Sequence, residues 1–206
     1  VLDLTRPLRK NNTGLDARQL FVGTSGVFGV VTKVVMRVVP RPAQRVTALV
    51  GLSSGSAVLG LLANLETRLG ELLTAFEAIG AAALAPVFRH QPRLRDPFGG
   101  RHPAYAVLVE LSSTLGAERL ALDDLLESAL AERLDVADGG ITDVFPGKPS
   151  ELWEIRHGVS ESLRQEGETL AFDVSVPRSS LAAFVDAARE TVAAGWPFVR
   201  FCDYGH

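Results

Sequence analysis

The sequence predicts an α+β protein in which helices pack on one face of a β-sheet. Short apolar runs bounded by turn-forming residues alternate with longer stretches that carry apolar residues at helical spacing. The 206 residues suffice for one large domain or for one domain plus a fragment. A content of 47% hydrophobic and 22% charged residues is typical of a globular chain. Strands and helices that alternate in this way favour a single sheet covered by helices.

The first elements follow directly from this pattern. Residues 46–52, VTALVGL, form an apolar run that ends in the turn formers SSG, so we expect a strand there. Residues 56–72 carry leucines at helical spacing, and Ser56 is the expected N-cap of that helix. The next expected elements are a strand at 73–79, a short helix beginning at 81–85 and an exposed Pro-, Gly- and Arg-rich loop at 89–103.

The second half of the chain repeats the alternation. The expected strands lie at 104–112, 135–144, 170–176 and 197–202. The expected helices lie at 116–134, 149–165 and 179–194. Gly139 and Gly140 interrupt one strand, and Gly167 follows the end of one helix, where glycine commonly stops a helix.

Residues 8–42 join a polar loop with regularly spaced glycines to a β-branched apolar run. Gly23, Gly26 and Gly29 allow φ above zero and close approach of a ligand to the backbone. The valine-rich run predicts a strand, which the Pro-Arg-Pro at 40–42 ends because proline cannot donate to a β-ladder. The loop suits a flat, phosphate-bearing cofactor, or else it is a tight structural turn. Its glycines precede a strand instead of opening a helix, so a Rossmann nicotinamide site is not expected.

Composition and charge exclude several classes of protein. The formal net charge of −3 gives no electrostatic case for nucleic acid binding. No segment reaches about 18 uninterrupted apolar residues, so no transmembrane helix is expected. The single cysteine, Cys202, excludes an internal disulfide and fits a reducing compartment. We expect it to be a small buried hydrophobe.

No signal peptide is visible, so we expect a cytoplasmic protein. The chain starts at Val1 and stops at His206 within patterned segments, so we expect an excerpt of a longer protein.

Arg156 is the candidate binding residue that the pattern itself offers. It lies on the predicted helix at 149–165, and Ser160 lies four residues further on, so both side chains share one face. The guanidinium is a planar fork suited to bidentate binding of a carboxylate, and Ser160 adds one hydroxyl. The alternative is an ordinary solvated arginine on a helix surface.

The motifs along the chain resemble those of a known family. Residues 11–42, NNTGLDARQLFVGTSGVFGVVTKVVMRVVPRP, are similar to the end of the FAD-binding domain in FAD-linked oxidases of the vanillyl-alcohol-oxidase-like superfamily. Within it the chain resembles the group of glycolate oxidase, D-lactate dehydrogenase and D-2-hydroxyglutarate dehydrogenase, which typically reads N-T-G-Y-D-L, G-S-E-G-T-L-G-I-V-T and L-x-P-x-P. The matching positions are Asn12, Thr13, Gly14, Asp16, Gly23, Gly26, Gly29, Val31, Thr32, Pro40 and Pro42. Later matches are AFEAI (75–79), YAVLVELSS (105–113), ELWEIRHGVSESL (151–163) and DVSVP (173–177).

The resemblance implies a fold, a cofactor and a binding site. Residues 1–42 would be the C-terminal end of a PCMH-type FAD-binding domain, with its last strands. Residues 43–206 would be a ferredoxin-like FAD-linked oxidase C-terminal (cap) domain, incomplete at its C-terminus. The residues expected to contact FAD, largely through backbone groups, are Gly23, Thr24, Ser25, Gly26, Gly29, Val30, Val31 and Thr32. Arg156 and Ser160 match the positions that bind the substrate carboxylate.

The resemblance also implies a reaction. The intact protein would oxidise a small D-2-hydroxy acid of the glycolate or D-lactate type by hydride transfer to the flavin, with a base from a later segment. Family members that act on 2-hydroxyglutarate place a Lys where this chain has Ala171, so a shorter acid is favoured. His206 matches the first histidine of a divalent metal site (Zn or Mn) in metal-using members; alone it is expected to be an exposed terminal residue.

Several expectations on partners accompany this interpretation. The electron acceptor is unknown, and a homodimer is the candidate assembly. We expect no catalytic residue within the 206 residues and no activity of this piece alone. An alternative is a non-catalytic α+β binding or assembly module derived from the same fold, suggested by Leu15, Ser25 and Val27 where the family usually has Tyr, Glu and Thr.

Overall fold

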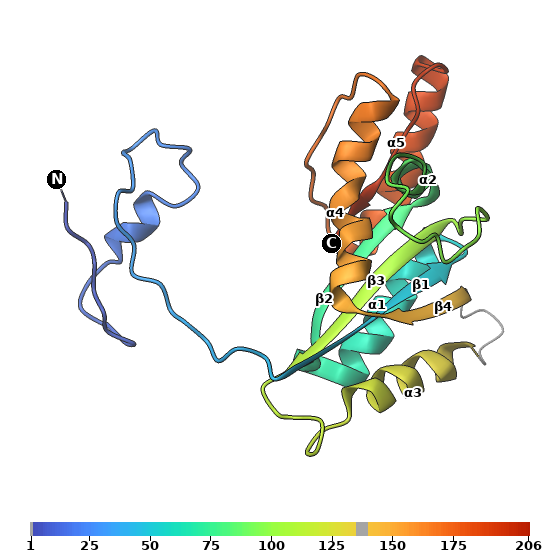
Figure 1. The fold of residues 1–206 in the computed structure, drawn as a ribbon. Helices are drawn as coiled ribbons and strands as arrows, with labels where there is room; N and C mark the ends of the chain where they lie inside the picture. The colour runs from blue at the N-terminus through green and yellow to red at the C-terminus, as the bar shows by residue number, and fades with distance from the viewer. Residues whose placement is uncertain (1, 135–139) are drawn as a thin grey trace. The chain divides into compact units, whose positions relative to one another are not determined.

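The computed structural model describes residues 2–134 and 140–206, and within it the chain divides into two compact units (Figure 1). The units are Val1–Arg41 and Pro42–His206. The division therefore falls at the Pro-Arg-Pro segment that follows the valine-rich run.

The first unit contains turns and one short 3-10 helix, η1 (Ala17–Leu20), which Asp16 caps through its side chain. The run from Val30 to Val39 carries no strand, and its valines are exposed. The predicted strand is therefore wrong for this chain. A β-branched extended segment becomes a strand only when a neighbour pairs with its backbone, and no described residue does so here.

A five-stranded antiparallel sheet forms the centre of the second unit in the described part of the chain. Its strands are β1 (Gln44–Leu52), β2 (Leu73–Gly80), β3 (Tyr105–Ser113), β4 (Ile141–Gly147) and β5 (Tyr204–Gly205). They lie side by side in the order β4-β1-β3-β2-β5. In this register Leu49 of β1 lies opposite Leu108 of β3, and Ile79 of β2 lies opposite Tyr204 of β5.

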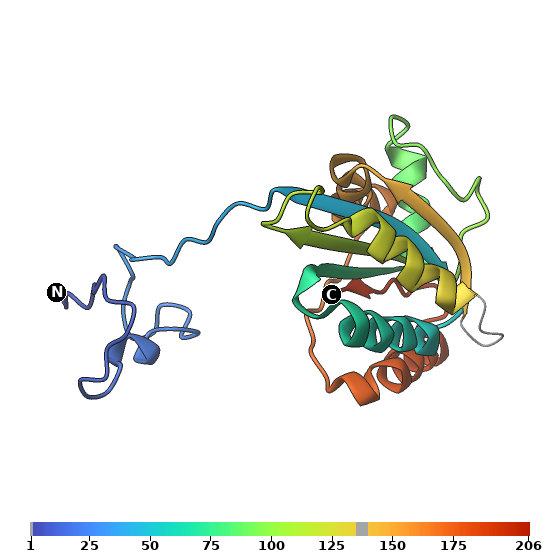
Figure 2. The same ribbon diagram turned by 90° about the horizontal axis from the view of Figure 1, so that it is seen from below.

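Helices cover both faces of this sheet, as Figure 2 shows for α1 and α4. The helices are α1 (Gly55–Leu69), α2 (Ala81–His90), α3 (Leu122–Leu134), α4 (Pro149–Glu166) and α5 (Leu181–Gly195), with 3-10 turns η2 (Gly70–Leu72) and η3 (Arg178–Ser180). Val50 and Val107 pack in one core with α1 and α3, whereas Leu49 and Leu108 pack in a second core with α2 and α4. The α+β class is confirmed, but the expectation of helices on one face is wrong.

Other predicted elements form with shifted ends. The N-cap of α1 is Ser54, whose Oγ accepts from the Ala57 backbone N–H at 3.1 Å, instead of Ser56. The third long helix begins at Leu122, not at 116. Of the predicted strand at 135–144, residues 135–139 lie outside the described residues, Gly140 is not in a strand, and residues 141–144 belong to β4.

Two predicted strands, at 170–176 and 197–202, do not form in the described structure. Leu170 and Phe172 in the first run are more than four-fifths exposed, so these apolar side chains are not buried in a core. Near the second run the sheet gains only the two-residue β5. Cys202 lies there only partly buried and outside a strand, and its Sγ donates to the Ala82 carbonyl of α2 at 3.5 Å.

Glu166 at the end of α4 ties three segments of the second unit together. Its carboxylate accepts hydrogen bonds from His90 and Arg89 at the end of α2, and from Arg200 in the segment before β5. These donors, His90 foremost, lower the pKa of Glu166 from an ordinary value of 4.5 to about 2.

Glu166 is therefore expected to make folding stability dependent on acid pH. A group whose pKa is lowered by folding stabilises the protein above its unfolded pKa, and that stability is lost as pH falls through the folded pKa. The stability difference between wild type and Glu166→Gln should be constant above pH 4.5 and should shrink between pH 4.5 and about 2. Urea unfolding at a series of pH values measures this difference. Glu161→Gln removes an exposed carboxylate from the same helix and is the matched control variant.

Candidate carboxylate-binding site

The candidate site lies along one edge of α4. Pro149 stands at the first turn of this helix, where its missing N–H costs nothing. Leu152, Ile155 and Val159 recur at helical spacing and bury one stripe of α4 in the second core, against the sheet. This packing fixes the rotation of the helix, so that Arg156 lies beside the buried stripe.

Arg156 is paired with Glu77 of β2. The Arg156 Nε donates to Glu77 Oε2 at 2.7 Å, and the two side chains are only 19% and 14% exposed. Glu77 stands two residues before the buried Ile79 on β2, so both side chains point to the α4 face of the sheet. The alternative of a freely solvated arginine therefore does not describe this side chain.

Tyr204 of β5 completes the group. The Arg156 guanidinium lies over the Tyr204 ring, 5.1 Å from its centroid, and the Tyr204 hydroxyl lies 3.1 Å from Ser160 Oγ. The pairing of β5 with Ile79 of β2 carries Tyr204 to this position. We call Glu77, Arg156, Ser160 and Tyr204 the Arg156 cluster. The structure thus brings Arg156 and Ser160 together, as their spacing predicts.

The Arg156 cluster has the chemistry of a carboxylate receptor. Glu77 takes the Nε–H, and no hydrogen bond or ion pair within the described residues uses Nη1 or Nη2 of Arg156. These two nitrogens form the end of a planar fork that can donate to both oxygens of a carboxylate. Ser160 and Tyr204 are both exposed, their hydroxyls lie 3.1 Å apart, and the Tyr204 ring faces the guanidinium. A ligand carboxylate would therefore meet two kinds of donor at one place.

Two of the candidate site residues were not predicted from the sequence. Glu77 is separated from Arg156 by 79 positions, and Tyr204 from Ser160 by 44. The sequence held one signal for Glu77. It lies two positions from the core residue Ile79 in an apolar strand, so its side chain faces the same side of the sheet as Ile79. A carboxylate at such a position needs a charged or hydrogen-bonding partner.

The predicted FAD-contacting residues lie in the first unit. Gly23 and Gly26 have φ of +75° and +84°, and a Cβ built on either would meet no atom within 4 Å. Val27 N–H donates to the Thr24 carbonyl at 2.9 Å, which closes a turn between these glycines. Ser25 also takes positive φ, of 50°. This open, left-handed backbone fits a group that is bound through main-chain N–H donors, as the family's cofactor would be here.

The predicted metal ligand, His206, is an exposed residue that directly follows β5. In the residues that the structure describes, no three His, Cys, Asp or Glu side chains come close enough to hold a metal ion. The metal role of His206 therefore stays a prediction. Of the helices in the described ranges, none has the length and apolar character needed to cross a membrane.

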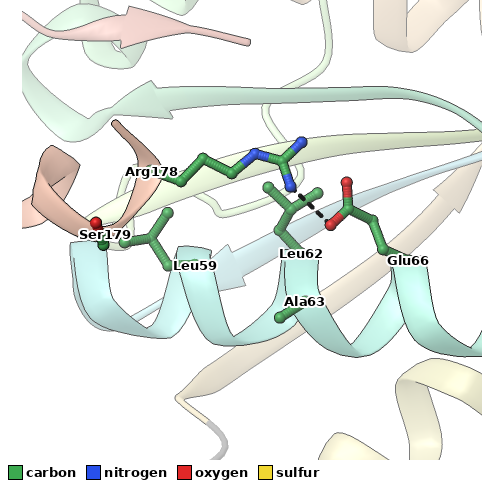
Figure 3. A pocket seen from close by; sticks show the side chains of 6 residues that line it. All are labelled: Leu59, Leu62, Ala63, Glu66, Arg178 and Ser179. Carbon is green, nitrogen blue, oxygen red and sulfur yellow. Dashed lines mark hydrogen bonds and ion pairs between the residues drawn. The ribbon is translucent and has the colours of Figure 1, made fainter. Parts of the chain in front are cut away.

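Two cavities in the second unit are lined by other residues. One, of about 180 Å³, runs along α1, where Arg178 reaches across to Glu66 at 2.7 Å (Figure 3). The other, of about 460 Å³, lies between the first turns of α1 and α2 and the side of α5. On its wall Tyr105 donates to Asp203 at 2.6 Å, and burial with this carboxylate raises the pKa of Tyr105 to about 12. Neither cavity is lined by a residue of the Arg156 cluster.

The fold and the family comparison together define the class of protein. Residues 41–206 match the family of FAD linked oxidases, C-terminal domain, and the chain belongs to this family. The FAD-linked oxidase resemblance and the α+β cap-domain fold are thereby confirmed. FAD is the cofactor that the family implies.

Individual relatives narrow the class. The chain is 30% identical over its whole length to the mitochondrial D-2-hydroxyglutarate dehydrogenase of Arabidopsis thaliana and 32% identical to that of Danio rerio. It is 31% identical, over 86% of its length, to a mitochondrial protein of Schizosaccharomyces pombe provisionally named a D-lactate dehydrogenase. The chain covers 36%, 38% and 33% of these three proteins, so it spans about a third of the relatives it matches.

The relatives also correct one prediction. These three proteins carry mitochondrial names, which contradicts the expectation of a cytoplasmic protein. The expectation rested on a single unpaired cysteine and on the absence of a visible leader. Cysteine usage separates oxidising from reducing compartments but does not identify which reducing compartment a protein occupies.

Proposed function

We propose that the full-length protein containing this chain is an FAD-dependent oxidoreductase that oxidises a small D-2-hydroxy acid. The observation that carries the proposal is Arg156, held between Glu77 and Tyr204, with both Nη groups unused by the described residues and the hydroxyls of Ser160 and Tyr204 in the same cluster. The names of the relatives support the substrate class, since they specify D-2-hydroxyglutarate or D-lactate.

Within this proposal the chain's own residues bind and orient the acid. Arg156 holds the two carboxylate oxygens, and Ser160 with Tyr204 supplies hydroxyl groups to the same end of the molecule. The backbone N–H groups of the Gly23–Gly29 turns contact the cofactor. FAD, when bound, supplies the acceptor for the hydride that leaves the substrate carbon.

The two candidate substrates differ in the length of the acid. A short acid such as D-lactate or glycolate is favoured by Ala171, which stands where family members acting on 2-hydroxyglutarate have a Lys, and which lies exposed in the coil after α4. Alanine offers no charge to a second carboxylate. D-2-hydroxyglutarate is the second candidate, favoured by the names of most of the relatives that match along the whole chain.

Anaerobic flavin absorbance of the purified full-length protein tests the proposal. Addition of D-lactate should bleach the oxidised flavin band rapidly, whereas L-lactate at the same concentration should leave it unchanged. Glycolate and D-2-hydroxyglutarate are added in parallel, and the faster bleaching identifies the better acid. A protein that binds no flavin, or whose flavin none of these acids reduces, would instead support the non-catalytic module.

A further inference from the structure

We propose that Glu77 is a positioning residue that sets the orientation of the Arg156 guanidinium for a substrate carboxylate, with the Tyr204 ring as its second support. This inference rests on the proposed function, because it concerns how the same site holds the acid. Glu77 itself touches only Arg156 among the described hydrogen bonds and ion pairs.

Glu77 occupies a place where a carboxylate needs a partner. It lies in the middle of β2, opposite Leu108 of β3, in a strand whose next inward residue, Ile79, is fully buried. An ionised carboxylate in such surroundings is costly unless a charged or hydrogen-bonding group compensates it. Arg156 provides that group through a single Nε contact of 2.7 Å. The strand therefore presents Glu77 as a fixed acceptor, because the backbone of β2 is held on both sides by β3 and β5.

The Arg156 side chain is restricted by two contacts. An arginine has several rotatable bonds, and ordering it for each binding event costs conformational entropy. Here one edge of the guanidinium is hydrogen-bonded to Glu77, and one face lies over the Tyr204 ring, 5.1 Å from its centroid. These two contacts define the plane of the fork before any ligand arrives. The Nη1 and Nη2 end is the part that they leave for a carboxylate.

Geometry and charge act in opposite directions at Glu77. Its negative charge lies next to the proposed carboxylate site, so its Coulombic effect on an acidic substrate is unfavourable. Its benefit must then come from the position of its acceptor oxygen. A side chain of the same length without the charge should therefore still orient Arg156 for the substrate. A shorter side chain that keeps the charge should not.

Two substitutions in the full-length protein make this distinction. Glu77→Gln keeps the acceptor oxygen in place and removes the charge, so the KM for D-lactate should stay within about threefold of wild type. Glu77→Asp keeps the charge and draws the acceptor back by one methylene, so the KM should rise about tenfold with a smaller change in kcat. The same pair of substitutions at Glu66, which binds Arg178 at the same distance of 2.7 Å, is the matched control and should leave KM unchanged.

The outcomes are separable. A KM that rises more for Glu77→Gln than for Glu77→Asp would overturn the positioning role in favour of a charge effect. Wild-type KM in both variants, with a lowered melting temperature, would show that Glu77 supports only the fold. If Arg156→Lys also leaves KM unchanged, the proposed site itself fails; if Arg156→Lys raises KM and neither Glu77 variant does, only the positioning inference fails. The dissociation constant of pyruvate, followed by the flavin spectrum without turnover, should change in the same order as KM.

Discussion

Arg156→Lys in the full-length protein is expected to raise the KM for its D-2-hydroxy acid about a hundredfold. A lysine ammonium carries its three donors on one nitrogen, so while it is bonded to Glu77 it cannot also present a planar pair of N–H groups to both oxygens of a substrate carboxylate. Because Glu77 is only 14% exposed, the ammonium should remain with that carboxylate and be drawn away from the substrate. Steady-state kinetics with an artificial electron acceptor measure the effect.

Arg178→Lys provides the control for this substitution. Arg178 also pairs with a glutamate at 2.7 Å, but on the surface of α1, outside the Arg156 cluster. Its replacement should leave KM within about twofold of wild type, since exposed ion pairs contribute little. Equal KM values for wild type and Arg156→Lys would remove Arg156 from the substrate site.

Leu108→Ala is expected to lower the free energy of unfolding of this chain by about 3 kcal/mol. Leu108 is fully buried in the second core, on the strand that lies between β1 and β2. Its removal leaves a cavity between the sheet and the helices α2 and α4, which cannot collapse because the neighbouring strands hold their spacing. Urea unfolding followed by circular dichroism measures the loss.

Leu115→Ala is the companion variant for the stability measurement. Leu115 is 42% exposed and lies between β3 and α3, so its truncation should change the free energy of unfolding by less than about 0.5 kcal/mol. Similar losses for both variants would contradict the assignment of Leu108 to a closely packed core between the sheet and α4.

The central strands could be predicted from sequence, but their surroundings could not. β1 and β3 read as apolar runs, and both formed close to the predicted residues. The same runs also indicate that helices cover both faces of the sheet, which was not predicted from the sequence. Ala48, Leu49 and Val50 are consecutive in β1 and all three are buried. A strand with one wet face alternates apolar and polar residues, whereas a continuous apolar strand indicates cover on both faces.

The false strands have a different cause. The run after Gly29 is rich in valine, and the run at 170–176 carries Leu, Phe and Val, so local propensity favours strand for both. Neither finds a pairing partner among the described residues, and propensity alone does not satisfy backbone hydrogen bonds. A sequence pattern reports which segments could join a sheet, not whether a neighbour is present.

Only two of the four residues of the Arg156 cluster could be predicted from the sequence. Arg156 and Ser160 lie on one helix, where spacing alone places them together. Glu77 and Tyr204 reach them only through the order and register of β2 and β5, which no local pattern specifies. Glu77 and Tyr204, the residues that strand pairing brings in, also determine which donors of Arg156 remain for a ligand, because Glu77 accepts from its Nε.

A crystal structure of the full-length protein with pyruvate, the product of D-lactate oxidation, tests the central claim most directly. We expect the pyruvate carboxylate to lie about 3 Å from Nη1 and Nη2 of Arg156, with the hydroxyl of Ser160 or Tyr204 on the same carboxylate and the Glu77 contact intact. Pyruvate bound at the flavin with its carboxylate on other residues, and Arg156 bonded to Glu77 alone, would contradict this assignment.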